Sequence, residues 1–219
     1  MKNILIIGID RFGYYLCKEF SKLNITTVAI DTDEHNLERV DKLVSKTIIG
    51  DSTDLDFIKT VGVDTFDECI VCIGTDFQNS LETVLNLKDL GAKKVTVRAI
   101  RESQETLLKR LGADLIVFPE KQQAKILALN SGVNCIYDFM ELEDNFGLYE
   151  STIPEKWDGK EVGDIRKEYN VSIICYKIGN KTKIVPGSHF VIDKKGQDNI
   201  VILGTEEDMS KLYTKEWFK

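Results

Sequence analysis

Residues 2–33 read KNILIIGIDRFGYYLCKEFSKLNITTVAIDTD, and they establish the class of fold. A short apolar run ends at Gly8, a glycine-containing turn leads to Gly13, and apolar residues then recur at helical spacing over 14–23. A second apolar run ends at Asp31. Strand, glycine turn, helix, strand and terminal carboxylate together form the first half of a Rossmann-like dinucleotide-binding fold.

The glycine turn predicts a phosphate contact, because a helix N-terminus presents free N–H groups and a positive dipole end to an anion. Asp10, however, stands where the G-x-G-x-x-G pattern has its middle glycine, and its charge would repel phosphate. Arg11 is expected to compensate by pairing with the phosphate. The alternative is a strand-to-helix turn that binds nothing. Asp31 has the expected offset for a ribose contact, and no arginine lies close to it in sequence, so NADP is the least expected dinucleotide.

Composition excludes several classes of protein. The formal net charge of −7, with no basic cluster, argues against nucleic-acid binding and against adsorption to an anionic membrane. No apolar run approaches the roughly 20 residues of a membrane-spanning helix. Because a strand follows the first residue directly, we expect no secretory signal and a cytoplasmic protein.

The five cysteines and two histidines offer little chemistry. Cys69 and Cys72 form a C-x-x-C inside an apolar run. Residues three apart on a strand point to opposite faces, so we expect buried structural thiols rather than a redox pair or metal site. His35 and His189 are far apart in the sequence, which disfavours a zinc site or a catalytic triad.

Strands and helices alternate along the chain to about residue 130. Strands are expected at 47–49, 69–73, 94–99 and 115–118, and helices at 34–43, 54–61, 79–90, 102–111 and 120–130. The strand segments are apolar throughout, which is typical of a parallel sheet covered on both faces. The first half is therefore an α/β domain with a doubly wound parallel sheet.

Ligands of such sheets bind beyond the carboxyl ends of the strands, near the point where the strand order reverses. The candidate nucleotide-binding residues lie at strand ends: Gly8, Asp10, Arg11, Phe12, Gly13, Asp31, Thr32, Asp33, Asp51, Ser52, Gly74, Thr75 and Arg98. For Asp51, Ser52 and Asp76, an alternative is that they only cap the helices that follow.

The second half of the chain has a different periodicity. An acidic stretch at 141–145 is interpreted as the boundary between a nucleotide-binding domain, 1–140, and a small α+β domain, 141–219. Strands are expected at 148–153, 171–178, 182–185 and 200–203, and helices at 159–169 and 206–213.

Several motifs resemble those of one family. They are GIDRFG at 8–13 (for G-x-G-R-F-G), AID at 29–31, IGTD at 73–76, GAD at 112–114 leading into FPEK at 118–121, DIR at 164–166 with Tyr169, Pro186, and VILG at 201–204. Over nearly its whole length the chain resembles the RCK proteins (regulators of K+ conductance), the cytosolic gating subunits of Ktr and Trk potassium uptake systems.

The resemblance implies a regulatory subunit with no chemical step. Such proteins form dimers that assemble into rings, commonly of eight subunits, under an integral-membrane potassium transporter at the inner face of the cell membrane. ATP, ADP or NAD(H) changes the shape of the ring and thereby the activity of the pore. By position, Arg11 would contact phosphate, Asp31 the ribose, and Glu120 a Mg2+ or other cation beside the phosphates.

Some relatives also bind cyclic di-AMP between their C-terminal halves. The matching positions are Arg166, Ser172, Ile173 and Pro186, and the alternative is a plain dimerisation module. Two other functions stay open: a small NAD-dependent oxidoreductase, and a scaffold whose nucleotide site has decayed. Neither His35 nor His189 is well placed for hydride-transfer chemistry.

Overall fold

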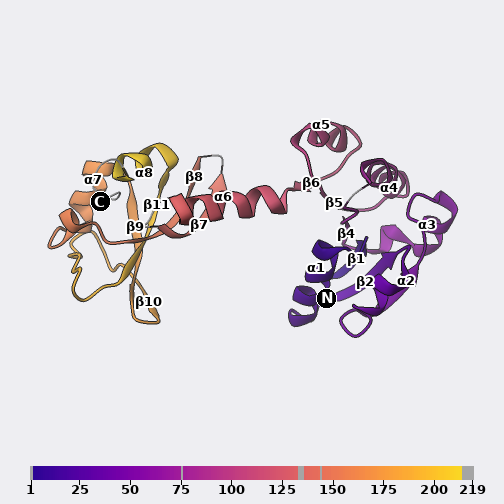
Figure 1. Ribbon diagram of the computed structural model, residues 1–219, viewed down its shortest axis with the longest axis horizontal. Coiled ribbons are helices and arrows are strands. Elements are labelled where there is room, and N and C mark those ends of the chain that lie inside the picture. The colour runs from indigo at the N-terminus through magenta and orange to yellow at the C-terminus, as the bar shows by residue number, and fades with distance from the viewer. Residues whose placement is uncertain (1, 75, 133–135, 144, 214–219) are drawn as a thin grey trace. The chain divides into compact units, whose positions relative to one another are not determined.

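The computed structural model describes residues 2–74, 76–132, 136–143 and 145–213 (Figure 1). The chain forms two compact units, Met1–Glu120 and Lys121–Lys219. The first contains a six-stranded sheet and the second a five-stranded sheet. The prediction of an α/β domain followed by a small α+β domain is therefore confirmed.

The first unit is a parallel sheet with the strand order β3-β2-β1-β4-β5-β6. Its elements are β1 (Asn3–Ile7), α1 (Arg11–Lys22), β2 (Thr26–Asp31), α2 (Glu34–Glu38), β3 (Lys46–Ile49), α3 (Leu55–Val61), a 3-10 turn (Val63–Thr65), β4 (Glu68–Val71), α4 (Phe77–Asp89), β5 (Val95–Arg98), α5 (Glu102–Arg110) and β6 (Leu115–Val117). Every neighbouring pair is parallel, and the order reverses between β1 and β4.

Both faces of this sheet are buried. On β1, Ile4 and Ile6 pack with residues of α1 and α2 in one core, whereas Leu5 and Ile7 pack with residues of α3, α4 and α5 in another. Helices therefore cover both faces, as Figure 1 shows. This double burial explains why the strands read as continuous apolar runs.

The C-x-x-C motif is divided between the two cores, as predicted. Cys69 lies in the core under α3–α5, and Cys72 lies in the core under α1 and α2. Both are fully buried, and so is Cys17. Burial raises the pKa of Cys17 and Cys69 to about 12 and raises the pKa of Cys72 as well.

Several helix boundaries differ from the predictions, in the first unit most of all those of α1 and α2. Helix α1 begins at Arg11 rather than at residue 14, because the Asp10 side chain caps it. Helix α2 ends at Glu38 rather than at residue 43. Beyond it the backbone N–H groups of Val40 and Leu43 bond to carbonyls only three residues back, so the chain continues as turns.

The second unit is an antiparallel sheet with the strand order β10-β9-β11-β8-β7. Its elements are α6 (Pro119–Gly132), which begins in the first unit, β7 (Ile136–Glu143), β8 (Phe146–Thr152), a 3-10 turn (Glu155–Trp157), α7 (Val162–Tyr169), β9 (Ser172–Ile178), β10 (Lys181–Ile184), β11 (Asn199–Thr205) and α8 (Glu206–Tyr213). Its core includes Trp157, Ile165 and Ile200, all fully buried.

The division between the units falls earlier in the chain than the predicted boundary at 140/141. Strand β7 pairs with β8 in the second sheet, so Glu141, Leu142 and Glu143 belong to that sheet and do not link two domains. The two compact units meet between Glu120 and Lys121, which lie in the first turn of α6.

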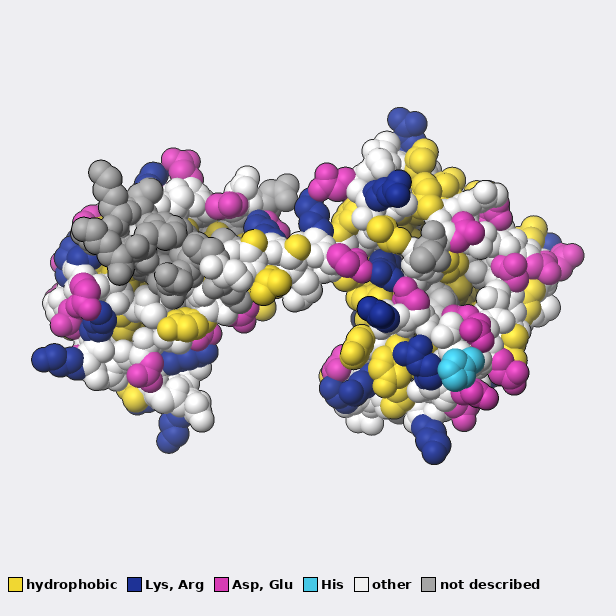
Figure 2. Space-filling view, viewed as in Figure 1, with side chains coloured by type: hydrophobic (Ala, Val, Ile, Leu, Met, Phe, Trp, Pro, Cys, Tyr) yellow, Lys and Arg dark blue, Asp and Glu magenta, His cyan; other side chains and the backbone are white. Residues whose placement is uncertain are grey.

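Among the described helices, none has the length and apolar character needed to cross a bilayer. Figure 2 shows acidic and basic side chains interspersed over the viewed surface of both units.

The buried thiols give a testable prediction. Cys17, Cys69 and Cys72 should be alkylated by iodoacetamide at pH 8 at least about a hundredfold more slowly in the folded protein than in urea, because only the thiolate reacts. Peptide mass spectrometry would report each site separately, and the half-buried Cys175 serves as the internal comparison. Rapid native labelling of Cys69 and Cys72, or a disulfide between them, would contradict the structural role.

Candidate nucleotide-binding site

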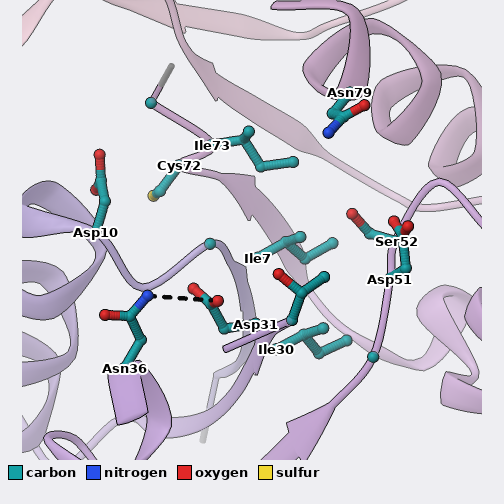
Figure 3. A pocket seen from close by; sticks show the side chains of 14 residues that line it. Ile7, Asp10, Ile30, Asp31, Asn36, Asp51, Ser52, Cys72, Ile73 and Asn79 are labelled. Atoms are coloured by element: carbon teal, nitrogen blue, oxygen red, sulfur yellow. Dashed lines mark hydrogen bonds between the residues drawn. The ribbon is translucent and has the colours of Figure 1, made fainter. Parts of the chain in front are cut away.

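A cleft lies at the carboxyl ends of β1, β2, β3 and β4, where the strand order of the first sheet reverses (Figure 3). Its wall consists of Ile7, Gly8, Asp10, Ile30, Asp31, Thr32, Asn36, Gly50, Asp51, Ser52, Cys72, Ile73, Gly74 and Asn79. This is the position at which open α/β sheets bind their ligands.

Seven of the predicted residues line this cleft: Gly8, Asp10, Asp31, Thr32, Asp51, Ser52 and Gly74. Five others lie at strand ends or in the turn but are not part of its wall: Arg11, Phe12, Gly13, Asp33 and Arg98. Thr75 lies outside the described residues. Contact of any of them with a ligand remains a prediction.

Sequence reasoning missed Asn36 and Asn79, which line the cleft from the first turns of α2 and α4. Both follow an Asp helix cap by three residues, at Asp33 and Asp76. The sequence signal that would have predicted them is a polar residue in the first turn of the helix that follows a strand. The other lining residues that were missed are Ile7, Ile30, Gly50, Cys72 and Ile73.

At two positions in the turn the backbone of a neighbouring segment leaves no room for a side chain. Gly8 has a φ of +88°, and a Cβ built on it would lie 3.0 Å from the Ile73 backbone nitrogen. A Cβ on Gly13 would lie 2.2 Å from the Gly8 carbonyl oxygen. Because both neighbours are backbone, α1 can start this close to β1 only with glycine at these positions.

Asp10 occupies the N-terminus of α1. Its Oδ1 accepts hydrogen bonds from the backbone N–H groups of Phe12 (2.9 Å) and Gly13 (3.3 Å), and its Oδ2 is ion-paired with Nη1 of Arg98. The carboxylate expected to repel phosphate is thus compensated by Arg98, at the end of β5. Arg11 is exposed on the first turn of α1, and its phosphate contact stays a prediction.

Arg98 is held between two carboxylates. Its Nη1 pairs with Asp10 and its Nη2 with Glu120, and its side chain is only 12% exposed. Burial acts to lower the pKa of Arg98, but hydrogen bonds and charge from Glu120 and Asp10 outweigh it and raise the pKa. The buried Nε of Arg98 has no hydrogen-bond partner among the described residues.

Glu120, the predicted cation ligand, is the other partner of this arginine. Burial acts to raise the pKa of Glu120, but hydrogen bonds from its own backbone N–H and from Arg98 lower it. Within the described ranges, no group of three or more acidic, His or Cys side chains forms a metal cluster. A cation at Glu120 would have to share the carboxylate with Arg98.

Asp31 is oriented by donors from two segments. Its Oδ2 accepts from the backbone N–H of Ile9 at 2.5 Å, and its Oδ1 accepts from the N–H of Asp33 at 2.9 Å. The amide of Asn36 also donates to Oδ1, at 3.5 Å, as the dashed line in Figure 3 shows. The carboxylate therefore has a fixed plane at the end of β2. It keeps acceptor capacity for a ribose hydroxyl.

Helix capping accounts for some of the predicted residues but not for Asp51. Asp76 caps α4 through the Asn79 N–H, whereas the cap of α3 is Asp54. Asp51 instead accepts from the N–H and hydroxyl of Thr53, and it lines the cleft. Ser52 is buried, with its hydroxyl bonded to that of Thr83, so its role is at least partly structural.

A second pocket lies in the C-terminal unit. It is lined by Val162, Gly163, Arg166, Ser172, Ile173, Val185, Gly187 and Ser188. It brings together three of the four residues predicted to hold a second messenger. Pro186 is not part of the wall, although both of its chain neighbours are. Ile173 is only 6% exposed and also belongs to the core.

Together, the parallel sheet, the glycine turn at its switch point and the oriented carboxylate after β2 define a domain of the Rossmann type. The TrkA-N domain family model matches residues 4–119, more than half of the chain. The protein belongs to this family.

Two similar relatives come from Bacillus subtilis (strain 168). Ktr system potassium uptake protein C is 35% identical over 212 residues, covering 96% of this chain and 95% of the relative. Ktr system potassium uptake protein A is 27% identical over 212 residues, with the same coverage. The relationship therefore spans both units.

The solved GsuK RCK domain is similar in fold, with a TM-score of 0.63 and 19% identity over 97% of this chain. The chain spans about half, 47%, of that solved chain. The GsuK channel has also been solved bound to NAD and to ADP. Because the sequence identity is only 19%, this similarity supports the fold alone.

The close approach of Gly13 to Gly8 can be tested. Gly13→Ala should lower the free energy of unfolding by roughly 3 kcal/mol, because the added methyl group meets a backbone oxygen that cannot move aside. Gly91→Ala is the matched control: its φ is +79°, but its Cβ would meet nothing within 4 Å. That variant should lose only about 1 kcal/mol, the cost of the left-handed backbone. Equal losses in urea unfolding would show that steric contact at Gly13 is not the constraint.

Proposed function

We propose that this protein is a nucleotide-sensing regulatory subunit of a potassium uptake system, in which nucleotide binding changes the activity of a membrane pore. The observation that carries the proposal is the cleft at the sheet's switch point, with its glycine turn and oriented Asp31. The 35% identity to a Ktr subunit over 96% of the chain supplies the physiological context.

The proposed ligand is an adenine nucleotide, ATP, ADP or NAD(H). Gly8 and Gly13 allow a phosphate to approach the start of α1, and Asp31 would accept from the ribose. Asp31 also disfavours NADP, because its carboxylate would repel a 2′-phosphate. Arg11, exposed beside the turn, is available for the phosphates, and Glu120 is the candidate ligand for an accompanying Mg2+ or other cation.

The proposed assembly is a homodimer that builds an octameric ring against an integral-membrane potassium transporter. In this arrangement the protein is cytoplasmic and lies at the inner face of the cell membrane. The ligand acts by population shift, so it gates the pore only as far as it binds one ring shape better than another. No chemical step is required.

The residues that line the cleft argue against the alternative function, an NAD-dependent dehydrogenase. Hydride transfer needs a proton donor or acceptor beside the nicotinamide, usually His, Lys or Tyr. None of the described residues that line the cleft is of these types. His35 is exposed beside Glu38, and His189 is exposed in the other unit beside Glu161.

The first test is calorimetric titration of the full chain with ATP, ADP, NADH, NAD and cyclic di-AMP, each with and without Mg2+. Saturable binding of an adenine nucleotide without turnover supports the sensor. Absence of binding for all five would instead favour a scaffold with a decayed site.

The ribose contact predicts the behaviour of Asp31→Ala. Affinity for the nucleotide should fall by about 10- to 100-fold, the worth of a hydrogen bond to a charged group. The fold should remain intact by circular dichroism. Asp54→Ala is the matched control: that carboxylate caps α3 and does not line the cleft, so affinity should change little. Unchanged affinity in Asp31→Ala would remove this residue from the site.

The C-terminal pocket gives a separate prediction for cyclic di-AMP. We infer that a guanidinium suits its phosphate, so Arg166→Ala should abolish binding. Lys167→Ala is the neighbouring control, since Lys167 pairs with Asp164 and does not line the pocket. If the wild-type protein does not bind cyclic di-AMP, the C-terminal unit is a dimerisation module without this ligand.

A further inference from the structure

Two of the donors that a phosphate would use at the start of α1 are already bonded. In a glycine turn of this type, an anion binds to free N–H groups of the first helical turn. Here the N–H groups of Phe12 and Gly13 both donate to Oδ1 of Asp10. A phosphate oxygen in that position would take the place of the carboxylate oxygen.

The largely buried guanidinium of Arg98 is engaged by the same carboxylate. Nη1 of Arg98 pairs with Oδ2 of Asp10, so one side chain satisfies both the helix N-terminus and the arginine. Gly74, on the cleft wall at the end of β4, makes room for the pair. A Cβ there would lie 2.5 Å from Oδ2 of Asp10 and 3.3 Å from Nη1 of Arg98.

We propose that Asp10 is an internal competitor for the phosphate of the ligand and sets the ligand preference of the cleft. The nucleoside part, held at Asp31, supplies most of the affinity. The phosphate adds little, because it must first displace Asp10 from Phe12, Gly13 and Arg98. This inference rests on the proposed function, since it concerns the same nucleotide cleft.

Asp54 provides a matched control inside the same unit. It caps α3 with the same geometry, accepting from the N–H groups of Asp56 at 2.9 Å and Phe57 at 3.3 Å. It is not part of the cleft wall. Replacing Asp54 by glycine therefore removes an equivalent cap without touching the proposed competitor.

The experiment measures the phosphate increment, which is the Kd of adenosine divided by the Kd of ADP. Both are titrated in EDTA into wild type, Asp10→Gly, Asp10→Asn and Asp54→Gly, and thermal unfolding confirms that each variant is folded. In Asp10→Gly the ratio should rise about tenfold, which corresponds to about 1.4 kcal/mol. The Kd of adenosine should not change, because the competitor acts only on the phosphate.

Asp10→Asn separates charge from capping. The amide oxygen can still accept from Phe12 and Gly13, so the ratio should rise less than in Asp10→Gly. Asp54→Gly should lose thermal stability as Asp10→Gly does and keep the wild-type ratio.

The outcomes distinguish this inference from the proposed function. A ratio in Asp10→Gly that stays within twofold of wild type, or falls, overturns the role of Asp10 while the nucleotide site stands. Binding of ADP to Asp10→Gly but not to wild type supports the proposal that Asp10 competes with the phosphate. If neither adenosine nor ADP binds wild type or either Asp10 variant, the proposed nucleotide site itself fails, and the inference with it.

Discussion

The candidate nucleotide cleft is bordered by the ion pair between Arg98 and Asp10. It joins the end of β5 to the turn after β1 across the end of β4, beside the part of the cleft wall that Asp10 and Gly74 form. A charged side chain that is 12% exposed needs its partners, because an unpaired buried charge costs several kcal/mol. The guanidinium of Arg98 therefore requires the carboxylates of Asp10 and Glu120 as partners, and the pair with Asp10 leaves no room for a side chain at Gly74.

The parallel sheet could be predicted because each strand is buried on both faces and reads as an apolar run. Asp31 could be predicted because its offset from Gly8 is local. The environment of Asp10 could not, because its partner Arg98 lies 88 residues away and only the sheet order brings them together. The boundary between units was misplaced for a related reason: the acidic composition at 141–145 suits a hairpin as well as a linker.

Aspartate side chains cap each of the first four helices, at Asp10, Asp33, Asp54 and Asp76. The helix that begins at the glycine turn is therefore capped like the helices that follow the other strands. A turn that relies on a ligand for its first N–H groups would leave them to water when empty. In this chain two of those groups, the N–H groups of Phe12 and Gly13, are bonded to Asp10 without a ligand.

A phosphate that enters the start of α1 would bind by exchange, because its hydrogen bonds to Phe12 and Gly13 would replace those of Asp10. Such an exchange makes binding less favourable than filling free donors would, but the contacts of the empty and the occupied cleft remain different. A regulator works through that difference, since a ligand shifts an equilibrium only by its differential affinity for the two states.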